Sequence, residues 1–321
     1  FHISWFLRLF WSFYCYFKPK SKITSLIECM KIVLIIPYRG IGDLIFHIPL
    51  IRGLSQKFNT KINILTNKVN KAKNLLKNEL SIKKIEYISF ERENQIRNSF
   101  EFYKKVNSFN SDISILTAPT RRLIIPLLLS NSKKKIYFKK DNIKDLSKYI
   151  IKHSKIELAD IKFNKDYSLE IEKNKIKRKN LFVSIDSRHN SNDWDQIYYI
   201  ELINKIFKKK LFSNIYINFD PSKKKSFKKI IDKFKNKKNI FFTHSTEFNK
   251  LILIMNNCSF IIGNESGPIC IGAALKKNVL SIYYPKHTNK SSKTIYNKVK
   301  FFNTDVFSSR KIIFNILKIL K

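Results

Sequence analysis

FIIGNESGPICIGAAL, residues 260–275, combines an apolar run, a polar turn and a small-residue segment. This order predicts a buried strand that turns directly into the start of a helix. Ser266 suits the N-cap, and Pro268 suits the first turn, where its missing N–H would have no partner. A helix N-terminus offers free N–H groups and a positive dipole end, so we expect this turn to bind phosphate. The hypothesis is that it holds the diphosphate of a nucleotide-linked donor.

The same alternation of strand and helix extends from Met30 to the end of the chain. Apolar runs such as KIVLII (31–36), KINILT (61–66), DISILT (112–117) and LFVSID (181–186) predict strands buried on both faces. Segments of helical character separate them and predict helices at 44–58, 69–79, 96–107, 121–130, 195–210, 222–236, 246–256 and 307–320. The fold class is therefore α/β, with two parallel sheets covered by helices on both faces. Ligands bind such sheets where the strands end, at their carboxyl edge.

Residues 1–29 stand apart, because they are dense in aromatics (FHISWFLRLFWSFYCYF) and end in the basic run KPKSK. Three interpretations remain open: the remnant of a membrane segment, an interfacial helix with a basic flank, or sequence upstream of a start at Met30. Peripheral membrane contact or a non-native start is favoured over a spanning helix. The pattern is not that of a signal peptide, since the basic residues follow the apolar run.

The formal charge of +39 comes from 63 Lys and Arg against 24 Asp and Glu. It indicates either an anionic partner, such as a phosphate-rich membrane surface, or a general lysine bias of the composition. Binding to nucleic acid through charge is a further hypothesis, but no known nucleic-acid-binding pattern supports a specific one. The four cysteines have no metal-ligand spacing and are interpreted as reduced thiols. The expected location is cytoplasmic, with peripheral binding at the inner membrane left open.

Three segments carry a resemblance to a known family. GIGDLIFHIPLIRGL (40–54) resembles the N-terminal signature of the lipopolysaccharide heptosyltransferases, glycosyltransferase family 9. NESGPICIGAAL (264–275) resembles the C-terminal signature of that family, and SIDSRHNSNDW (184–194) resembles its polar donor loop. The resemblance covers the chain from Met30 onward.

The resemblance implies a GT-B fold, in which two Rossmann-like domains with parallel sheets face each other across a cleft. The expected divisions are an extension (1–29), an acceptor-binding domain (30–165), a linker (166–180), a nucleotide-sugar-binding domain (181–305) and a C-terminal helix (306–321). The implied reaction is an inverting transfer of a sugar, most typically heptose from ADP-heptose, onto a lipopolysaccharide core or related glycolipid. No catalytic metal and no cofactor are expected, since the nucleotide sugar is a co-substrate.

The resemblance also implies roles for individual residues. Asp43 would be the general base that takes the proton of the acceptor hydroxyl. The residues expected at the donor are Ser187, Arg188, Glu265, Ser266, Gly267, Pro268 and His287. Those expected at the acceptor are Arg39, Gly40 and Gly42. Asp43 has a simpler interpretation as the N-cap of helix 44–58, and His47 is interpreted as a packed core residue.

Three positions depart from the family's pattern. Glu265 stands where the family has aspartate, Cys270 where it has histidine, and Asn192 where a lysine is frequent. These departures leave open a transferase that uses another nucleotide sugar, or a degenerate protein that keeps the fold as a scaffold. The literal DxD at residues 193–195 would suit a metal in another transferase class, but Asp195 also suits the cap of the following helix.

Overall fold

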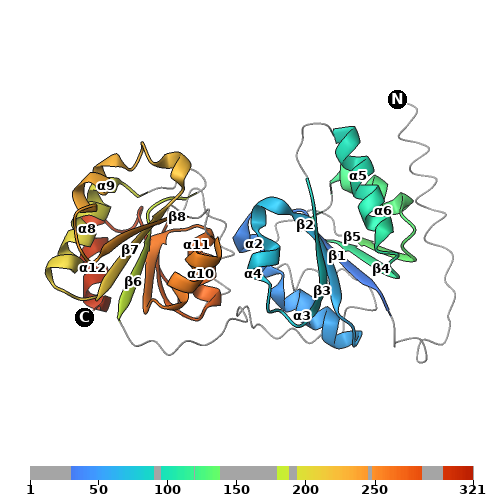
Figure 1. The fold of residues 1–321 in the computed structure, drawn as a ribbon, viewed down its shortest axis with the longest axis horizontal. Helices are drawn as coiled ribbons and strands as arrows, with labels where there is room; N and C mark the ends of the chain where they lie inside the picture. Colours follow the sequence, from blue (N-terminus) through green and yellow to red (C-terminus); the bar gives the residue numbers. More distant parts are fainter. Residues whose placement is uncertain are drawn as a thin grey trace.

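The computed structural model describes residues 30–89, 95–118, 120–137, 179–187, 194–244, 248–283 and 299–320. These residues form two α/β halves, each built on a parallel sheet (Figure 1). The strand order is β3-β2-β1-β4-β5 in the N-terminal half and β11-β10-β9-β6-β7-β8 in the C-terminal half. The predicted fold class is therefore confirmed.

The elements of the N-terminal half follow each other as strand and crossover. Their bounds are β1 (Ile32–Ile36), α2 (Ile41–Phe46), α3 (Ile48–Lys57), β2 (Ile62–Asn67), α4 (Ala72–Leu75), β3 (Ile82–Ile88), α5 (Gln95–Ser108), β4 (Ile113–Leu116), α6 (Arg121–Leu129) and β5 (Lys134–Tyr137). The chain moves from β1 outward to β3 and then returns to β4 and β5. Because parallel crossovers are right-handed, α5 and α6 share one face of the sheet, and α2 to α4 lie on the other.

The C-terminal half repeats this layout. Its elements are β6 (Asn180–Ser184), α8 (Gln196–Lys208), β7 (Asn214–Phe219), α9 (Lys228–Phe234), β8 (Ile240–His244), α10 (Phe248–Asn256), β9 (Phe260–Asn264), α11 (Gly267–Ala274), β10 (Asn278–Tyr283), β11 (Val299–Asn303) and α12 (Ser309–Leu320). The opening stretch is thus strand β9, a two-residue turn and helix α11. The predicted linker (166–180) lies almost wholly outside the described residues, so the domain boundaries stay predictions.

Three helices differ from their predicted extent by more than two residues at an end or by a break. The helix predicted at 44–58 begins earlier, at Ile41, and is divided at His47 into α2 and α3. The division follows from Pro49, which has no N–H to continue the hydrogen-bond ladder. The helix predicted at 69–79 is reduced to a single 3-10 turn and α4, and the one predicted at 222–236 to a 3-10 turn and α9.

The two halves share one apolar cluster. It joins β1, α2 and α3 of the first half to residues of β6, α10 and α11 of the second, among them Phe182, Leu251 and Ile271. All three of these side chains are buried. Asn74 of the α4 segment also donates to Asn249 of α10, with 2.9 Å between Nδ2 and Oδ1. The halves are therefore in direct apolar and polar contact in this structure.

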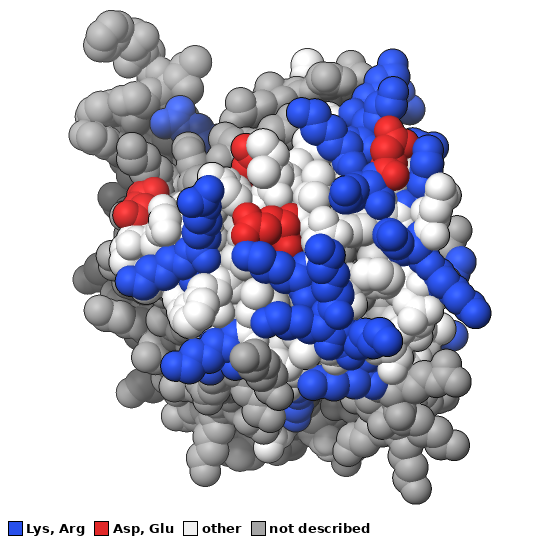
Figure 2. Space-filling view, turned by 90° about the vertical axis from the view of Figure 1, so that its left-hand side faces the viewer, with Lys and Arg blue, Asp and Glu red and all other residues white. Residues whose placement is uncertain are grey.

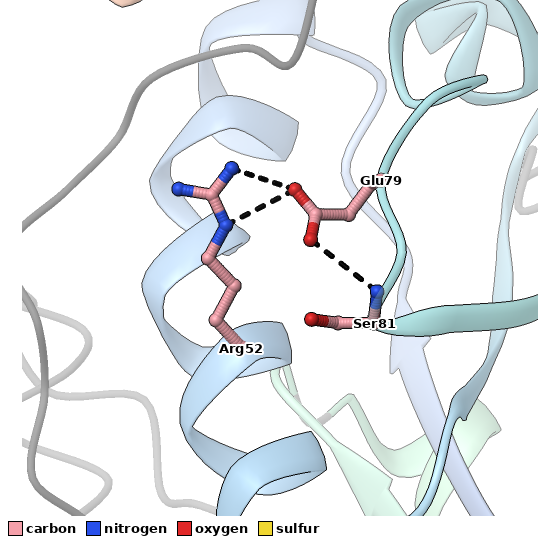
Figure 3. Close-up of polar contacts among 3 residues, drawn as sticks. All are labelled: Arg52, Glu79 and Ser81. Carbon is pink, nitrogen blue, oxygen red and sulfur yellow. Dashed lines mark hydrogen bonds and ion pairs between the residues drawn. The ribbon is translucent and has the colours of Figure 1, made fainter.

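A largely buried ion pair joins the middle of α3 to the loop before β3. Arg52 donates from Nε and Nη2 to Oε2 of Glu79, at 3.0 and 2.7 Å, and Oε1 of Glu79 accepts from the backbone N–H of Ser81 (Figure 3). The Glu79 side chain is only 7% exposed. The pair therefore fixes the loop before β3 against α3.

Within the described residues, no helix is long and apolar enough to cross a membrane. The positive charge is spread widely, and Figure 2 shows Lys and Arg across the face of the C-terminal half that lies on the left in Figure 1. Residues 205–238 alone hold 13 lysines and two acidic residues. Charge by itself therefore does not locate a binding surface.

Candidate functional site

The segment after β1 turns sharply into α2. Gly40 is the N-cap of this helix, so the prediction that Asp43 is the N-cap is wrong, and Asp43 is instead its third residue. The Asp43 carboxylate folds back over Gly40, where a Cβ atom would collide with Oδ2. Glycine at position 40 therefore makes room for the carboxylate.

His47, at the break between α2 and α3, positions the backbone of Asp43. The backbone N–H of His47 is bonded to Leu44 O at 3.0 Å, and the His47 imidazole lies 2.6 Å from Asp43 O through Nδ1. A carbonyl only accepts, so Nδ1 carries the proton and donates it. The side chain of His47 thus provides the carbonyl of Asp43 with a donor next to the break that Pro49 imposes.

His47 is 1% exposed, and its Nε2 atom has no hydrogen-bond partner among the described residues. Burial lowers the pKa of His47 to about 4 and outweighs the hydrogen bond to the Asp43 backbone, which acts in the opposite direction. The imidazole is therefore neutral at physiological pH. The prediction that His47 is a packed residue is confirmed, but its bond to Asp43 was not foreseen.

Tyr38 packs beside the same residues. Its ring lies 5.6 Å from that of His47, centroid to centroid, in a tilted arrangement. Burial, and secondarily the negative charge of Asp43, raises the pKa of Tyr38 to about 12. The phenol therefore keeps its proton and presents a neutral hydroxyl near the carboxylate.

In the C-terminal half, the ends of β6 and β9 lie side by side, with Ser184 paired to Gly263. A Cβ on Gly263 would collide with the carbonyl oxygen of Ser184, so this close approach requires glycine. Next along the chain, Asn264 is fully buried and donates from Nδ2 to Ile185 O at 3.0 Å. Its Oδ1 accepts from the backbone N–H of Trp194 and from the hydroxyl of Tyr199, at 3.0 and 2.9 Å.

These bonds join the two segments, 184–194 and 264–275, that the sequence assigned to the donor. Ser187, which follows β6, and Ser266, which follows β9, leave the same edge of the sheet on neighbouring strands. Ser266 is the N-cap of α11, as predicted, although its side chain makes no cap hydrogen bond. Its buried Oγ has no partner in the described part of the chain. The start of α11 therefore combines a helix N-terminus with an unused hydroxyl.

The N-termini of α2 and α11 meet. A Cβ on Gly267 would lie 3.5 Å from Cβ of Ile41, and a Cβ on Gly42 would lie 2.9 Å from Sγ of Cys270. The second distance is shorter than side chains tolerate, so Gly42 allows the two helices to approach. Two segments far apart in sequence thus lie in one place.

The structure therefore brings together Gly40, Gly42 and Asp43 from the first half with Glu265, Ser266, Gly267 and Pro268 from the second. Arg39 is exposed on the loop before α2. Ser187 is buried at the end of β6. Arg188 and His287 lie outside the described residues, as do Asn192 and Asp193, the first residue of the DxD pattern. Asp195 caps α8 through a bond from Ile197 N–H, as its simpler interpretation predicted.

Lys223 is a cation that no sequence pattern distinguishes. Its Nζ donates to Ser187 O at 2.5 Å, from the short turn that follows β7. Sequence reasoning missed it, since a lysine in a lysine-rich run after a strand carries no specific signal. In space it places positive charge next to the donor side of the site.

No group of three or more His, Cys, Asp or Glu side chains suited to a metal ion occurs in the described segments. Cys258 and Cys270, the two cysteines of those segments, are both reduced thiols.

Comparison with known proteins connects the site to a family. The sequence profile of glycosyltransferase family 9 (heptosyltransferase) matches residues 143–306. No curated protein sequence matches the chain.

Solved structures are similar in fold at low sequence identity. The E. coli ADP-heptose lipopolysaccharide heptosyltransferase II has a TM-score of 0.69 at 11% identity, covering 91% of this chain and 98% of its own. A family 9 glycosyltransferase from Veillonella parvula also has a TM-score of 0.69, at 16% identity, covering 91% and 90%. E. coli heptosyltransferase WaaC with ADP has a TM-score of 0.63 at 11% identity, covering 90% and 98%. The fold is thus GT-B.

Proposed function

The chain belongs to glycosyltransferase family 9, and we propose that it transfers a sugar from a nucleotide diphosphate, most typically heptose from ADP-heptose, to a lipopolysaccharide core or related glycolipid. One observation carries the proposal. The two signature segments, 40–54 and 264–275, touch at Gly42 with Cys270 and at Ile41 with Gly267. Two solved structures of E. coli heptosyltransferase WaaC contain ADP and ADP-2-deoxy-2-fluoro heptose, which supports a nucleotide-sugar donor.

On the donor side, we assign the diphosphate to the start of α11. Its N-terminal N–H groups and the unpartnered Ser266 hydroxyl are donors of the kind that stabilise a leaving phosphate without a metal ion. Lys223 adds a cation beside Ser187, in the absence of the lysine that the family often has at position 192. Arg188, Glu265 and His287 complete the proposed donor set.

On the acceptor side, Asp43 is the proposed base. It would take the proton of the acceptor hydroxyl as that oxygen attacks the anomeric carbon, giving inversion. The carboxylate lies over Gly40, beside a phenol that keeps its proton, and its backbone is bonded to His47. Arg39 and Gly42 are the proposed acceptor contacts. The acceptor would be reached at the cytoplasmic face of a membrane by a peripherally bound enzyme.

Substitution of the proposed base tests the assignment. We expect Asp43→Asn to lower kcat by on the order of a hundredfold or more, the contribution of a general base, with little change in the affinity for ADP. The matched control is Asp232→Asn, which makes the same change in an exposed α9 ion pair. Product mass from assays with ADP-, UDP- and GDP-sugars identifies the donor. Turnover retained in Asp43→Asn would refute the role of Asp43.

Calorimetry distinguishes an enzyme from a scaffold that keeps only the fold. A transferase binds one nucleotide diphosphate in preference to the others, and Ser266→Ala and Lys223→Ala each weaken that binding. The absence of binding to any of the three nucleotide diphosphates would favour the scaffold and overturn the proposal.

A further inference from the structure

Helices α5 and α6 expose an unusual amount of apolar surface. Five large side chains on them are exposed, which are Ile96 (89%), Phe100 (58%), Ile125 (59%), Leu128 (45%) and Leu129 (68%). We call these five residues the α5–α6 apolar patch. Single exposed apolar residues are ordinary, but five of them on two helices that pack together indicate a binding surface.

The two helices lie side by side on one face of the first sheet (Figure 1). The Ser99 hydroxyl of α5 donates to the carbonyl of Arg122 in α6 at 3.3 Å, which sets the two helices in register near their N-terminal ends. Both also bury an inner face against β1, through Phe102 and Val106 of α5 and Leu123 and Leu127 of α6. The exposed residues are therefore a second apolar face, on the side away from the sheet.

The sequence of α6 also indicates a second apolar face. RRLIIPLLL is apolar at every position after its two arginines. A helix that is apolar all round is normally covered on all sides. Here the inner side meets the sheet and the outer side meets solvent, so the outer side lacks a cover among the described residues.

The residues around the patch are basic. Arg97, Lys104 and Arg121 are exposed on the same two helices, whose only acidic residue is Glu101. The Lys104 ammonium lies 4.5 Å from the centroid of the Phe100 ring. Apolar side chains flanked by Lys and Arg suit the boundary between lipid headgroups and acyl chains, where cations contact anionic headgroups.

A second copy of the chain would fit this surface poorly. An isologous contact brings the same residues of two copies together, so the three cations would face their equals in a protein of formal charge +39. The lysine-rich face in Figure 2 has the opposite character. It is basic. Among the described residues, helices α8 and α12 of that half expose one large apolar side chain each, Ile197 and Phe314.

We propose that the α5–α6 apolar patch, with Arg97, Lys104 and Arg121, is the surface by which this protein docks on an anionic lipid bilayer. The inference deepens the proposed function, because a glycolipid acceptor lies in such a bilayer. Both helices begin at the carboxyl edge of the first sheet, the edge at which α2 and Asp43 also follow a strand. Docking through this patch therefore holds the half of the protein that carries Asp43 at the membrane surface.

Vesicle co-sedimentation of the full chain tests the proposal. Phosphatidylcholine vesicles with and without phosphatidylglycerol are used, and they hold neither donor nor acceptor. We expect binding only with the anionic lipid, and binding that falls as salt rises. Phe100→Ser with Leu129→Ser should weaken binding by roughly tenfold or more. The control pair, Ile197→Ser with Phe314→Ser, removes side chains of nearly equal exposure (60% and 67%) and should leave binding unchanged.

Charge is tested separately. Arg97→Gln, Lys104→Gln and Arg121→Gln together should weaken binding on the order of a hundredfold, from about fivefold for each cation. Lys224→Gln, Lys225→Gln and Lys228→Gln remove the same charge from the other half and should have a much smaller effect. Equal losses in the two triple variants, unchanged binding in the Phe100 and Leu129 variant, or a dimer that this variant dissociates would each overturn the proposal. Activity on a lipid-free acceptor reports on the proposed function independently.

Discussion

His47 gives the fold a sensitivity to acid that can be measured. The folded protein holds this imidazole neutral, with its pKa lowered from an ordinary 6.5 to about 4 by burial, whereas the unfolded chain titrates normally. Above the unfolded pKa both states are neutral, and the residue has no effect on the pH dependence. As pH falls below that value, the unfolded state binds a proton that the folded state does not. Stability is therefore lost as the solution becomes more acidic.

The magnitude follows from the two pKa values. Between about pH 8 and about pH 4.5, a group moved from 6.5 to about 4 removes about 2.5 kcal/mol from the free energy of unfolding. The change to test is His47→Asn, which keeps a donor near Nδ1 but does not titrate. We expect the wild type to lose about 2.5 kcal/mol more than His47→Asn over this range.

The assay is denaturant unfolding of both proteins at a series of pH values. The carboxylates of Glu86 and Asp112, whose pKa values are lowered mainly by hydrogen bonds from lysines, also lose stability in acid, but they do so equally in both proteins. The difference between the two curves therefore isolates His47. Parallel curves would refute the conclusion that the imidazole is buried and neutral.

His47→Leu separates the hydrogen bond from the titration. Leucine fills the site without a donor, which removes the hydrogen bond from the imidazole to the Asp43 carbonyl, a net contribution of about 0.5–1.5 kcal/mol. We expect kcat to fall by roughly tenfold in His47→Leu and to recover in His47→Asn, with the KM for donor unchanged in both. Equal loss in the two variants would show that packing, and not the bond to Asp43, matters.

Three further changes test the contacts around the site. Gly42→Ala should lower kcat/KM by roughly tenfold, since its Cβ would meet Sγ of Cys270 at 2.9 Å, and adding Cys270→Ala should restore much of that loss. Glu79→Gln should lower the free energy of unfolding by about 2–3 kcal/mol in denaturant titrations, because a neutral amide replaces the carboxylate that pairs with Arg52 in a largely buried place. Asn264→Ala should cost about 3 kcal/mol in thermal unfolding, since three buried hydrogen bonds depend on that one amide.

The strands were the most predictable part of the molecule. Runs such as KIVLII and LFVSID are buried on both faces, and a short continuous apolar run between polar segments is typical of strands in a parallel sheet. The start of α2 was not predictable in the same way, because Gly40 caps it without a side chain. The break near Pro49 was missed, since one helix was predicted over residues 44–58, and its effect on Asp43 depends on where the His47 ring points.

The two segments that form the site were predictable from the sequence, but their contact in space was not. The signatures identified residues 40–54 and 264–275 through a family resemblance, while the contact of Gly42 with Cys270 arises only from tertiary packing. Lys223 was hidden among many lysines. The helix at 121–130 was predicted, but a strand-and-helix pattern does not tell which of its apolar residues remain exposed.

The apolar cluster that crosses from α2 and α3 to α10 and α11 limits how this protein can be divided in the laboratory. Cutting the chain between β5 and β6 would leave Leu251 and Ile271 of one fragment, and Leu44 and Ile48 of the other, without the neighbours that bury them. Such fragments should aggregate when expressed alone and become soluble when co-expressed. Crystallisation, labelling and split-reporter designs are therefore better based on the whole chain than on either half.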